Sequence, residues 1–226
     1  DSYVSLIWAS FSACAVALVM TLVQRILTLK EALEAWVTGL KAMLFAFVIL
    51  ILAWALGQIT LEVHTAEYLI HLLTGNLDPR LLPVIIFIVC ALISFATGTS
   101  WGTMAIMMPV SVPLAVALAG AADMDAAAAH TILVGVISSV LAGSVWGDHC
   151  SPISDTTILS SMASSCDHIA HVRTQLPYAL AVGVVAMLVG DIPTAFGLSP
   201  WISLVVGAGI LFGILWWLGQ REDPVN

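Results

Sequence analysis

The sequence predicts an all-α membrane protein, a polytopic bundle of helices. Of its 226 residues, 61% are hydrophobic and only 9% are charged, and the mean hydropathy is +1.07. Soluble domains carry about 25% charged residues. Several apolar runs approach about 20 residues, the length that a helix needs to cross a membrane. The alternating pattern of a membrane barrel does not occur. We therefore expect a single transmembrane domain over residues 1–226.

The charged residues and cysteines narrow the classes of partner. Six Lys and Arg residues are too few and too scattered to form a nucleic-acid surface. The four cysteines show no CxxC spacing, so we expect reduced thiols. The first residue is Asp1 rather than Met, and we expect the chain to be part of a longer protein.

Seven apolar segments are expected along the chain, separated by polar connections. An amphipathic stretch from Lys30 leads into the second segment, and the polar residues 61–78 are expected to be partly helical at the membrane interface. The fifth segment is interrupted at 147–157, which predicts a broken helix over 130–165. The seven predicted ranges are 4–27, 40–59, 81–96, 104–119, 130–165, 176–196 and 200–218.

The third and fourth segments are short for spans. About 16 residues of helix measure roughly 24 Å, against a hydrocarbon core of about 30 Å. This length favours a re-entrant hairpin over residues 81–119. Two full spans would return the chain to the same side of the membrane, so that arrangement stays open.

The basic residues predict an orientation. The connection at 120–125 is acidic and has no Lys or Arg, and Arg80 is the one basic residue expected on that same, outer side. Basic residues gather in cytoplasmic connections. We therefore expect these residues on the cytoplasmic side: Arg25, Lys30, Lys41, Arg173 and Arg221.

The first polar interruption is TGTSWGT, residues 97–103. Gly98 and Gly102 are expected to release the helix, which would free backbone carbonyls beside the hydroxyls of Thr97, Thr99 and Ser100 as oxygen ligands. An ordinary exposed turn between two spans is the alternative. Its lack of charged residues and its tryptophan are unusual for such a turn.

The second interruption is WGDHCSPISDTTILSS, residues 146–161, which places two aspartates and a histidine among serines and threonines. Before it, small residues recur every fourth position from Gly135 to Gly147, a face that lets another helix approach closely. Pro152 lacks an N–H and clashes with the preceding turn, so we expect a break around Gly147 and Pro152. A polar loop at the membrane edge is the alternative, but the apolar pattern resumes after Thr157.

The chemistry of this interruption suits a hard cation. A carboxylate inside a membrane usually marks an ion or proton pathway. Na⁺ prefers oxygen ligands, as other hard cations do, and the segment offers carboxylates, hydroxyls and carbonyls. Desolvation makes a carboxylate bind protons more readily. A proton and Na⁺ would therefore compete for Asp148 and Asp155, and such competition is what an exchanger requires.

Three other functions compete with cation exchange. A zinc site from His149, Cys150, Cys166, His168 and His171 matches no metal motif by its spacing. Intramembrane aspartyl proteolysis needs GxGD and YD motifs, but residues 143–148 read GSVWGD and no YD dipeptide occurs. We therefore expect no enzyme activity. A channel would use similar oxygen chemistry, and proton-coupled, saturable flux separates an exchanger from it.

The two interruptions, with CDHIAHVRTQLPYAL at 166–180 and LAWALG at 52–57, resemble the C-terminal half of the NhaC family of Na⁺/H⁺ antiporters, in the ion-transporter superfamily. The resemblance implies Na⁺/H⁺ exchange in the cell inner membrane, by a fold of inverted repeats with hairpins and broken helices. It also implies a missing N-terminal half, and an inert structural membrane fragment is therefore an alternative to an active exchanger. Relatives that exchange organic acids such as malate or lactate leave the substrate open, and a homodimer also stays open.

The resemblance also implies roles for single residues. Asp148 and Asp155 would be the ion-binding and proton-linked carboxylates that hold the transported Na⁺, with no further cofactor. His149 would tune its neighbours, although a structural hydrogen-bonding role is the alternative. The supporting oxygens would come from Thr97, Thr99, Ser100, Ser151, Ser154, Thr156 and Thr157.

Overall fold

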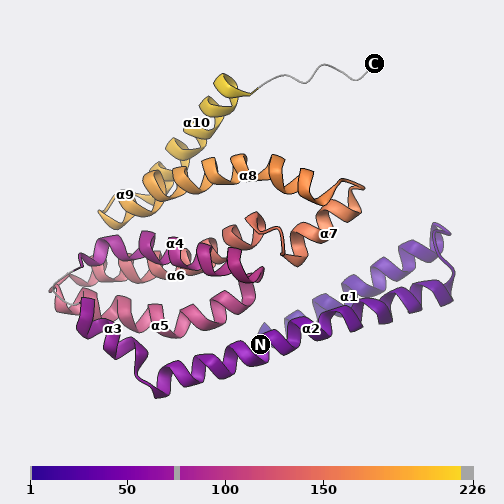
Figure 1. Cartoon of the computed structure of the whole chain (residues 1–226), viewed down its shortest axis with the longest axis horizontal. Coiled ribbons are helices and arrows are strands. Elements are labelled where there is room, and N and C mark those ends of the chain that lie inside the picture. The colour runs from indigo at the N-terminus through magenta and orange to yellow at the C-terminus, as the bar shows by residue number, and fades with distance from the viewer. Residues whose placement is uncertain (1, 74–76, 220–226) are drawn as a thin grey trace. The chain divides into compact units, whose positions relative to one another are not determined.

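The structure is a computed structural model that describes residues 2–73 and 77–219. Nearly all of this part of the chain is helical, and it contains no strand (Figure 1). The predicted all-α class is therefore confirmed. Among the described residues, five helices are long and apolar enough to cross a membrane, as expected of a multi-pass membrane protein: Pro79–Thr97, Ser100–Ala121, Ala126–Cys150, His168–Ala195 and Pro200–Leu218.

The chain divides into two compact units, Asp1–Ile51 and Leu52–Asn226. The first contains helix α1 (Ser2–Val23) and the beginning of α2 (Leu29–Glu62). Helix α2 includes both the amphipathic lead-in and the second apolar segment, so the two form one helix. Its 34 residues would measure about 51 Å. A reciprocal cap starts it: the backbone N–H of Thr28 donates to Glu31 Oε2 at 2.7 Å, and Glu31 N–H donates back to Thr28 Oγ1 at 3.4 Å.

Three helices form the centre of the second unit: α4 (Leu82–Thr97), α5 (Ser100–Ala121) and α6 (Ala126–Cys150). Helix α6 packs against both of the others, and α3 (Thr65–Leu73) packs against α5. The fully buried side chains at the centre of this core include Leu82, Cys90, Leu118, Ile132, Val136 and Val140. Residues 61–78, expected to be partly helical, thus contribute a short helix that covers one side of the trio.

The small-residue face of α6 is where α4 lies. A Cβ on Gly143 would come within 2.5 Å of the Phe87 carbonyl oxygen, and a Cβ on Gly147 would overlap the carbonyl of Ala91. Only glycine allows the two backbones to approach this closely. Ser94 Oγ on α4 donates to the Ser144 carbonyl on α6 at 2.6 Å. The sequence predicted a close-packing face, and the structure identifies its partner.

Helix caps explain why several helices begin earlier than predicted. Asp125 Oδ1 accepts hydrogen bonds from Ala127 N–H and Ala128 N–H, at 3.0 and 2.9 Å, so α6 begins at Ala126 instead of 130. Asp167 likewise caps α8 (His168–Val185), which starts eight residues before the predicted 176. Aspartate is a preferred N-cap because its side chain satisfies free backbone donors.

The expected lengths of the third and fourth segments were too short. Asp78 and Pro79 start a 3₁₀ turn that leads into α4, and Thr99 caps α5, so the apolar helices have 19 and 22 residues. Both are long enough to span a membrane. Helix length therefore no longer favours a re-entrant hairpin over two spans, and the hairpin at 81–119 stays a prediction.

The chain then turns through a break to α7 (Asp155–Ala163) and α8. Helix α8 continues into a π-helical segment, Ala186–Asp191, and a short α9 (Ile192–Ala195), before α10 (Pro200–Leu218). Trp146 on α6 donates from Nε1 to the Ala179 carbonyl of α8 at 2.8 Å, and its ring lies against Gly183. This contact holds α8 beside the half of α6 that leads to the break.

Candidate cation site at the break between α6 and α7

Helix α6 ends at Cys150, and four residues separate it from α7. Ser151 has an extended backbone (ψ 129°), and its N–H donates to the Asp148 carbonyl at 3.0 Å. The break therefore occupies residues 151–154, narrower than the predicted 147–157. Gly147 lies inside α6, so the prediction that it breaks the helix is wrong; its role is to let α4 approach. Pro152 lies within the break.

Asp148 receives hydroxyl groups on both of its carboxylate oxygens. Ser154 Oγ donates to Oδ1 at 2.8 Å, and Thr156 Oγ1 donates to Oδ2 at 3.2 Å. Ser154 Oγ and Thr156 Oγ1 are also 2.8 Å apart. Asp148 retains only 8% of its surface exposure. The last turn of α6 thus presents a buried carboxylate to the first turn of α7, where the helix dipole favours negative charge.

The turn at 97–99 meets this break, although about fifty residues of chain separate them. Ser151 Oγ donates to the Phe95 carbonyl at 2.8 Å. Gly98 adopts a left-handed conformation (φ 68°), and a Cβ there would lie 2.9 Å from the Ile153 carbonyl oxygen. A larger residue at 98 would be strained and would also push the turn from the break. The two polar interruptions therefore lie together.

The remaining predicted oxygens point elsewhere in this structure. Thr97 Oγ1 donates to the Ile93 carbonyl within α4, and Thr99 Oγ1 accepts from Gly102 N–H as the cap of α5. Ser100 is the first residue of α5. Gly102 lies inside α5, so the prediction that it releases a helix is wrong. Gly98 ends α4, and Thr99 caps the start of α5.

Three predicted residues flank the Asp148 cluster. Thr157 Oγ1 donates to the His149 carbonyl at 3.2 Å, which ties α7 back to α6. The His149 side chain is exposed. Asp155 is the first residue of α7, but its side chain lies outside the described part of the structure. Its proposed ion-binding role therefore stays a prediction.

Sequence analysis missed the residues of α8 that support the break. His168 Nε2 lies 2.6 Å from the Pro152 carbonyl, and its Nδ1 lies 3.1 Å from Ser161 Oγ on α7. Because a carbonyl only accepts, Nε2 carries a proton. Gln175 Nε2 donates to the His149 carbonyl. The signal for them was their polarity at one end of an apolar segment, but nothing local indicated which carbonyls they would reach.

The cluster differs from the metal centres built from His and Cys. Within residues 2–73 and 77–219, no group of three His, Cys, Asp or Glu side chains comes together. The His and Cys residues considered for a zinc site therefore do not form a ligand set in the described part of the chain. What the break offers is one carboxylate with hydroxyl and carbonyl oxygens, the ligand class of hard cations.

A family model described as the Na⁺/H⁺ antiporter family matches residues 1–190. The chain belongs to this family. The resemblance seen in the sequence is confirmed at the family level, and the narrower NhaC assignment and the placement in a C-terminal half stay predictions. Membership in an antiporter family agrees with the expectation that the protein is not an enzyme.

Curated relatives extend the comparison. An uncharacterized protein of Haemophilus influenzae is 39% identical over 217 residues, which cover 96% of this chain and 40% of the relative. The malate-2H⁺/Na⁺-lactate antiporter of Bacillus subtilis is 30% identical over 160 residues, 70% of this chain and 32% of the relative. An uncharacterized Na⁺/H⁺ antiporter of H. influenzae is 35% identical over 119 residues, 50% of this chain and 23% of the relative.

The chain spans less than half the length of these relatives. No solved structure gave a match.

Proposed function

We propose that the protein exchanges Na⁺ for H⁺ across a membrane, and that the two ions compete for the carboxylate of Asp148. The observation that carries the proposal is a nearly buried Asp148 whose two oxygens are met by the Ser154 and Thr156 hydroxyls. Membership in the Na⁺/H⁺ antiporter family supports it. In this scheme Asp155, at the start of α7, is the second proton-linked carboxylate.

The hydroxyl groups let one cluster serve both ions. With Asp148 ionised, each hydroxyl donates a hydrogen bond to the carboxylate, at the distances given above. When Na⁺ arrives, the hydroxyls rotate so that their oxygen lone pairs face the cation. When a proton arrives instead, it neutralises the carboxylate and removes the charge that attracts Na⁺. Each ion therefore expels the other.

The helix break gives the site a means of movement. Residues 151–154 have no continuous helical hydrogen bonding. His168 contacts the Pro152 carbonyl inside the break, and Gln175 donates to the His149 carbonyl just before it. A break between two half-helices lets one half shift while the other stays packed, as alternating access requires. The packing of α4 against α6 supplies the fixed side.

The test is proton flux in vesicles that contain the full-length protein. With an inward Na⁺ gradient, the unchanged protein should move protons outward, and Asp148→Asn should reduce this flux at least about a hundredfold while the protein remains folded. Asp125→Asn is the matched control. It removes the same charge from the other end of α6 but keeps a good N-cap, so its flux should match that of the unchanged protein.

Normal exchange by Asp148→Asn would contradict the proposal, as would exchange lost equally in Asp125→Asn. Asp155→Asn is tested in the same way.

A second candidate is Na⁺- and H⁺-coupled exchange of small organic acids. The 30% identity to a malate-2H⁺/Na⁺-lactate antiporter over 70% of the chain favours it. The same vesicles distinguish the two: proton movement that requires malate or lactate, and does not occur with Na⁺ alone, would replace the first proposal with this one.

A further inference from the structure

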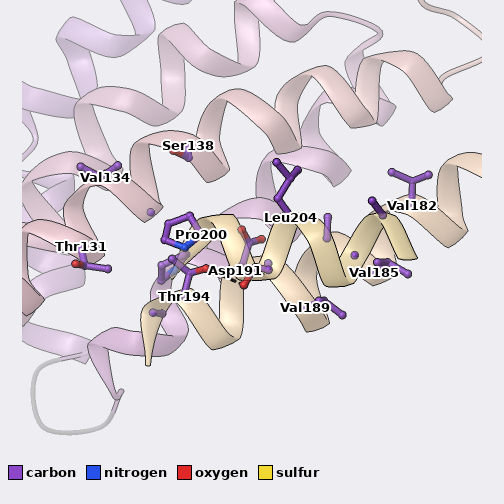
Figure 2. A pocket seen from close by; sticks show the side chains of 18 of the residues that line it. Thr131, Val134, Ser138, Val182, Val185, Val189, Asp191, Thr194, Pro200 and Leu204 are labelled. Atoms are coloured by element: carbon purple, nitrogen blue, oxygen red, sulfur yellow. Dashed lines mark hydrogen bonds between the residues drawn. The ribbon is translucent and has the colours of Figure 1, made fainter. Parts of the chain in front are cut away.

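A cavity lies away from the helix break, between α6, α8, α9 and α10. Its volume is about 670 Å³, within the range of about 300–1,000 Å³ common for small-molecule sites. Figure 2 shows its lining, with Thr131 and Ser138 on α6 and Leu204 on α10. Ser138 lies ten residues before Asp148, about 15 Å along α6. None of the residues of the Asp148 cluster lines this cavity.

Asp191 brings a carboxylate to the cavity wall. It is the last residue of the π-helical segment Ala186–Asp191, a distortion that often marks functional sites. In Figure 2 its carboxylate lies among the side chains of Thr194, Pro200 and Leu204. Oδ2 is buried and has no hydrogen-bond partner among the described residues. Burying a carboxylate oxygen in this way is costly unless something pairs with it.

The other groups around the cavity do not neutralise Asp191. No Lys or Arg occurs among the residues that line it, and His130 is the one basic side chain there. His130 is exposed and is the first residue of α6 to line the cavity. Thr194 Oγ1 and Ser203 Oγ lie 3.5 Å apart and are engaged with each other. Asp191 Oδ2 is therefore left as an acceptor without a donor among the described residues.

The remaining wall decides the class of ligand. Most of it consists of apolar side chains: Val134, Val182, Val185, Val189, Ala195, Leu204, Ala208 and Leu211. A bare metal ion needs several oxygen ligands at once, and beside Asp191 the wall offers only the hydroxyl groups of Thr131, Ser138, Thr194 and Ser203. An ion that carries its own apolar body needs only one charged partner. An ammonium group supplies the donors that Asp191 Oδ2 lacks.

We propose that this cavity is a binding site for a small organic ammonium ion, with the ammonium group on Asp191 and the apolar body against the valines of α8. The site is separate from the cation site at the break, because no residue of the break or of α7 lines it. A ligand that binds only the folded state stabilises it by RT ln(1 + L/Kd), where L is the free ligand concentration.

The test uses n-hexylammonium as the probe and the full-length protein in lipid nanodiscs. The midpoint of thermal unfolding should rise with hexylammonium concentration, in proportion to its logarithm once the concentration exceeds Kd. 1-Hexanol, which lacks the charge, should give no such rise. Asp191→Asn should weaken hexylammonium binding by at least about tenfold, the loss expected for one charged hydrogen bond.

A second variant guards against a change in folding. Gly207→Val places a side chain in the cavity, and its Cβ would lie 3.7 Å from the Val185 side chain, an ordinary contact distance. This variant should also weaken hexylammonium binding. Its unfolding midpoint without the probe should stay unchanged. Asp148→Asn should bind hexylammonium normally, whether or not Na⁺/H⁺ exchange occurs. Unchanged binding in Asp191→Asn, or an equal response to 1-hexanol, would overturn the proposal.

Discussion

At the scale of single residues, the hydrogen bonds of Asp148 govern what the break can hold. Its oxygens accept hydrogen bonds from the hydroxyls of Ser154, the last residue of the break, and of Thr156, in the first turn of α7. Hydroxyls can donate or accept, whereas a Lys or Arg would fix the carboxylate in one charged state. The pair of hydroxyls therefore suits the exchange of Na⁺ for H⁺ that we propose for Asp148.

Ser154→Ala should weaken Na⁺ binding without abolishing exchange. It removes the hydroxyl on Asp148 Oδ1, and one net hydrogen bond corresponds to about a tenfold rise in the Na⁺ concentration at half-maximal flux. Ser160→Ala is the control, because the Ser160 hydroxyl is exposed and donates only to a carbonyl of its own helix. Equal Na⁺ dependence in Ser154→Ala and the unchanged protein would remove Ser154 from the site.

At the scale of helices, glycine spacing on α6 fixes the frame from which the break projects. Gly143 and Gly147 bring the backbone of α4 into contact, and Ser151 and Gly98 then bring the 97–99 turn onto the break. The position of Asp148 therefore depends on how closely two helices approach one turn before it.

Gly147→Ala tests this dependence. The added methyl would overlap the Ala91 carbonyl, and overpacking of this kind destabilises by about 1–3 kcal/mol. Gly209→Ala in α10 is the control. Its Cβ would meet nothing within 4 Å, so the better helix propensity of alanine should leave stability equal or slightly higher. Both free energies of unfolding are measured by the same denaturant titration, and equal values would show that the approach of α4 and α6 is not tight.

At the scale of the whole molecule, the bundle has to place the two ends of α6 on opposite sides of a membrane if the break carries ions across it. Helix α6 has 25 residues, enough for a span. The residues before it carry acidic side chains and those after α7 lead to Arg173, which predicts the cytoplasmic side for the second group.

Thiol labelling checks this arrangement. Cys166 is exposed after α7 and should react with a membrane-impermeant reagent only from the cytoplasmic side, in a Cys14→Ser background. Ala122→Cys, exposed before α6, should react only from the opposite side once Cys14 and Cys166 are replaced. Reaction of both positions from one side would contradict a spanning α6.

The sequence by itself determined the helical membrane class, the two polar interruptions and the small-residue face of α6. These features are local: composition sets the solvent a segment prefers, Pro152 removes a donor wherever it stands, and a four-residue period describes one side of one helix. The helix boundaries were predicted less accurately from the sequence, because single aspartates at positions 125 and 167 cap α6 and α8 and extend them beyond their apolar runs.

Only the tertiary structure decided which of the predicted oxygens reach Asp148, which helix fills the glycine face, and that Asp191 faces a cavity. Ser151 and Phe95 are 56 residues apart in the chain, and His168 and Pro152 are 16 apart. Contacts at such separations depend on how whole helices pack, and packing in turn depends on shapes that no local pattern encodes. That is why Thr97 and Thr99 bond within their own helices while Ser154 and Thr156 close over the carboxylate.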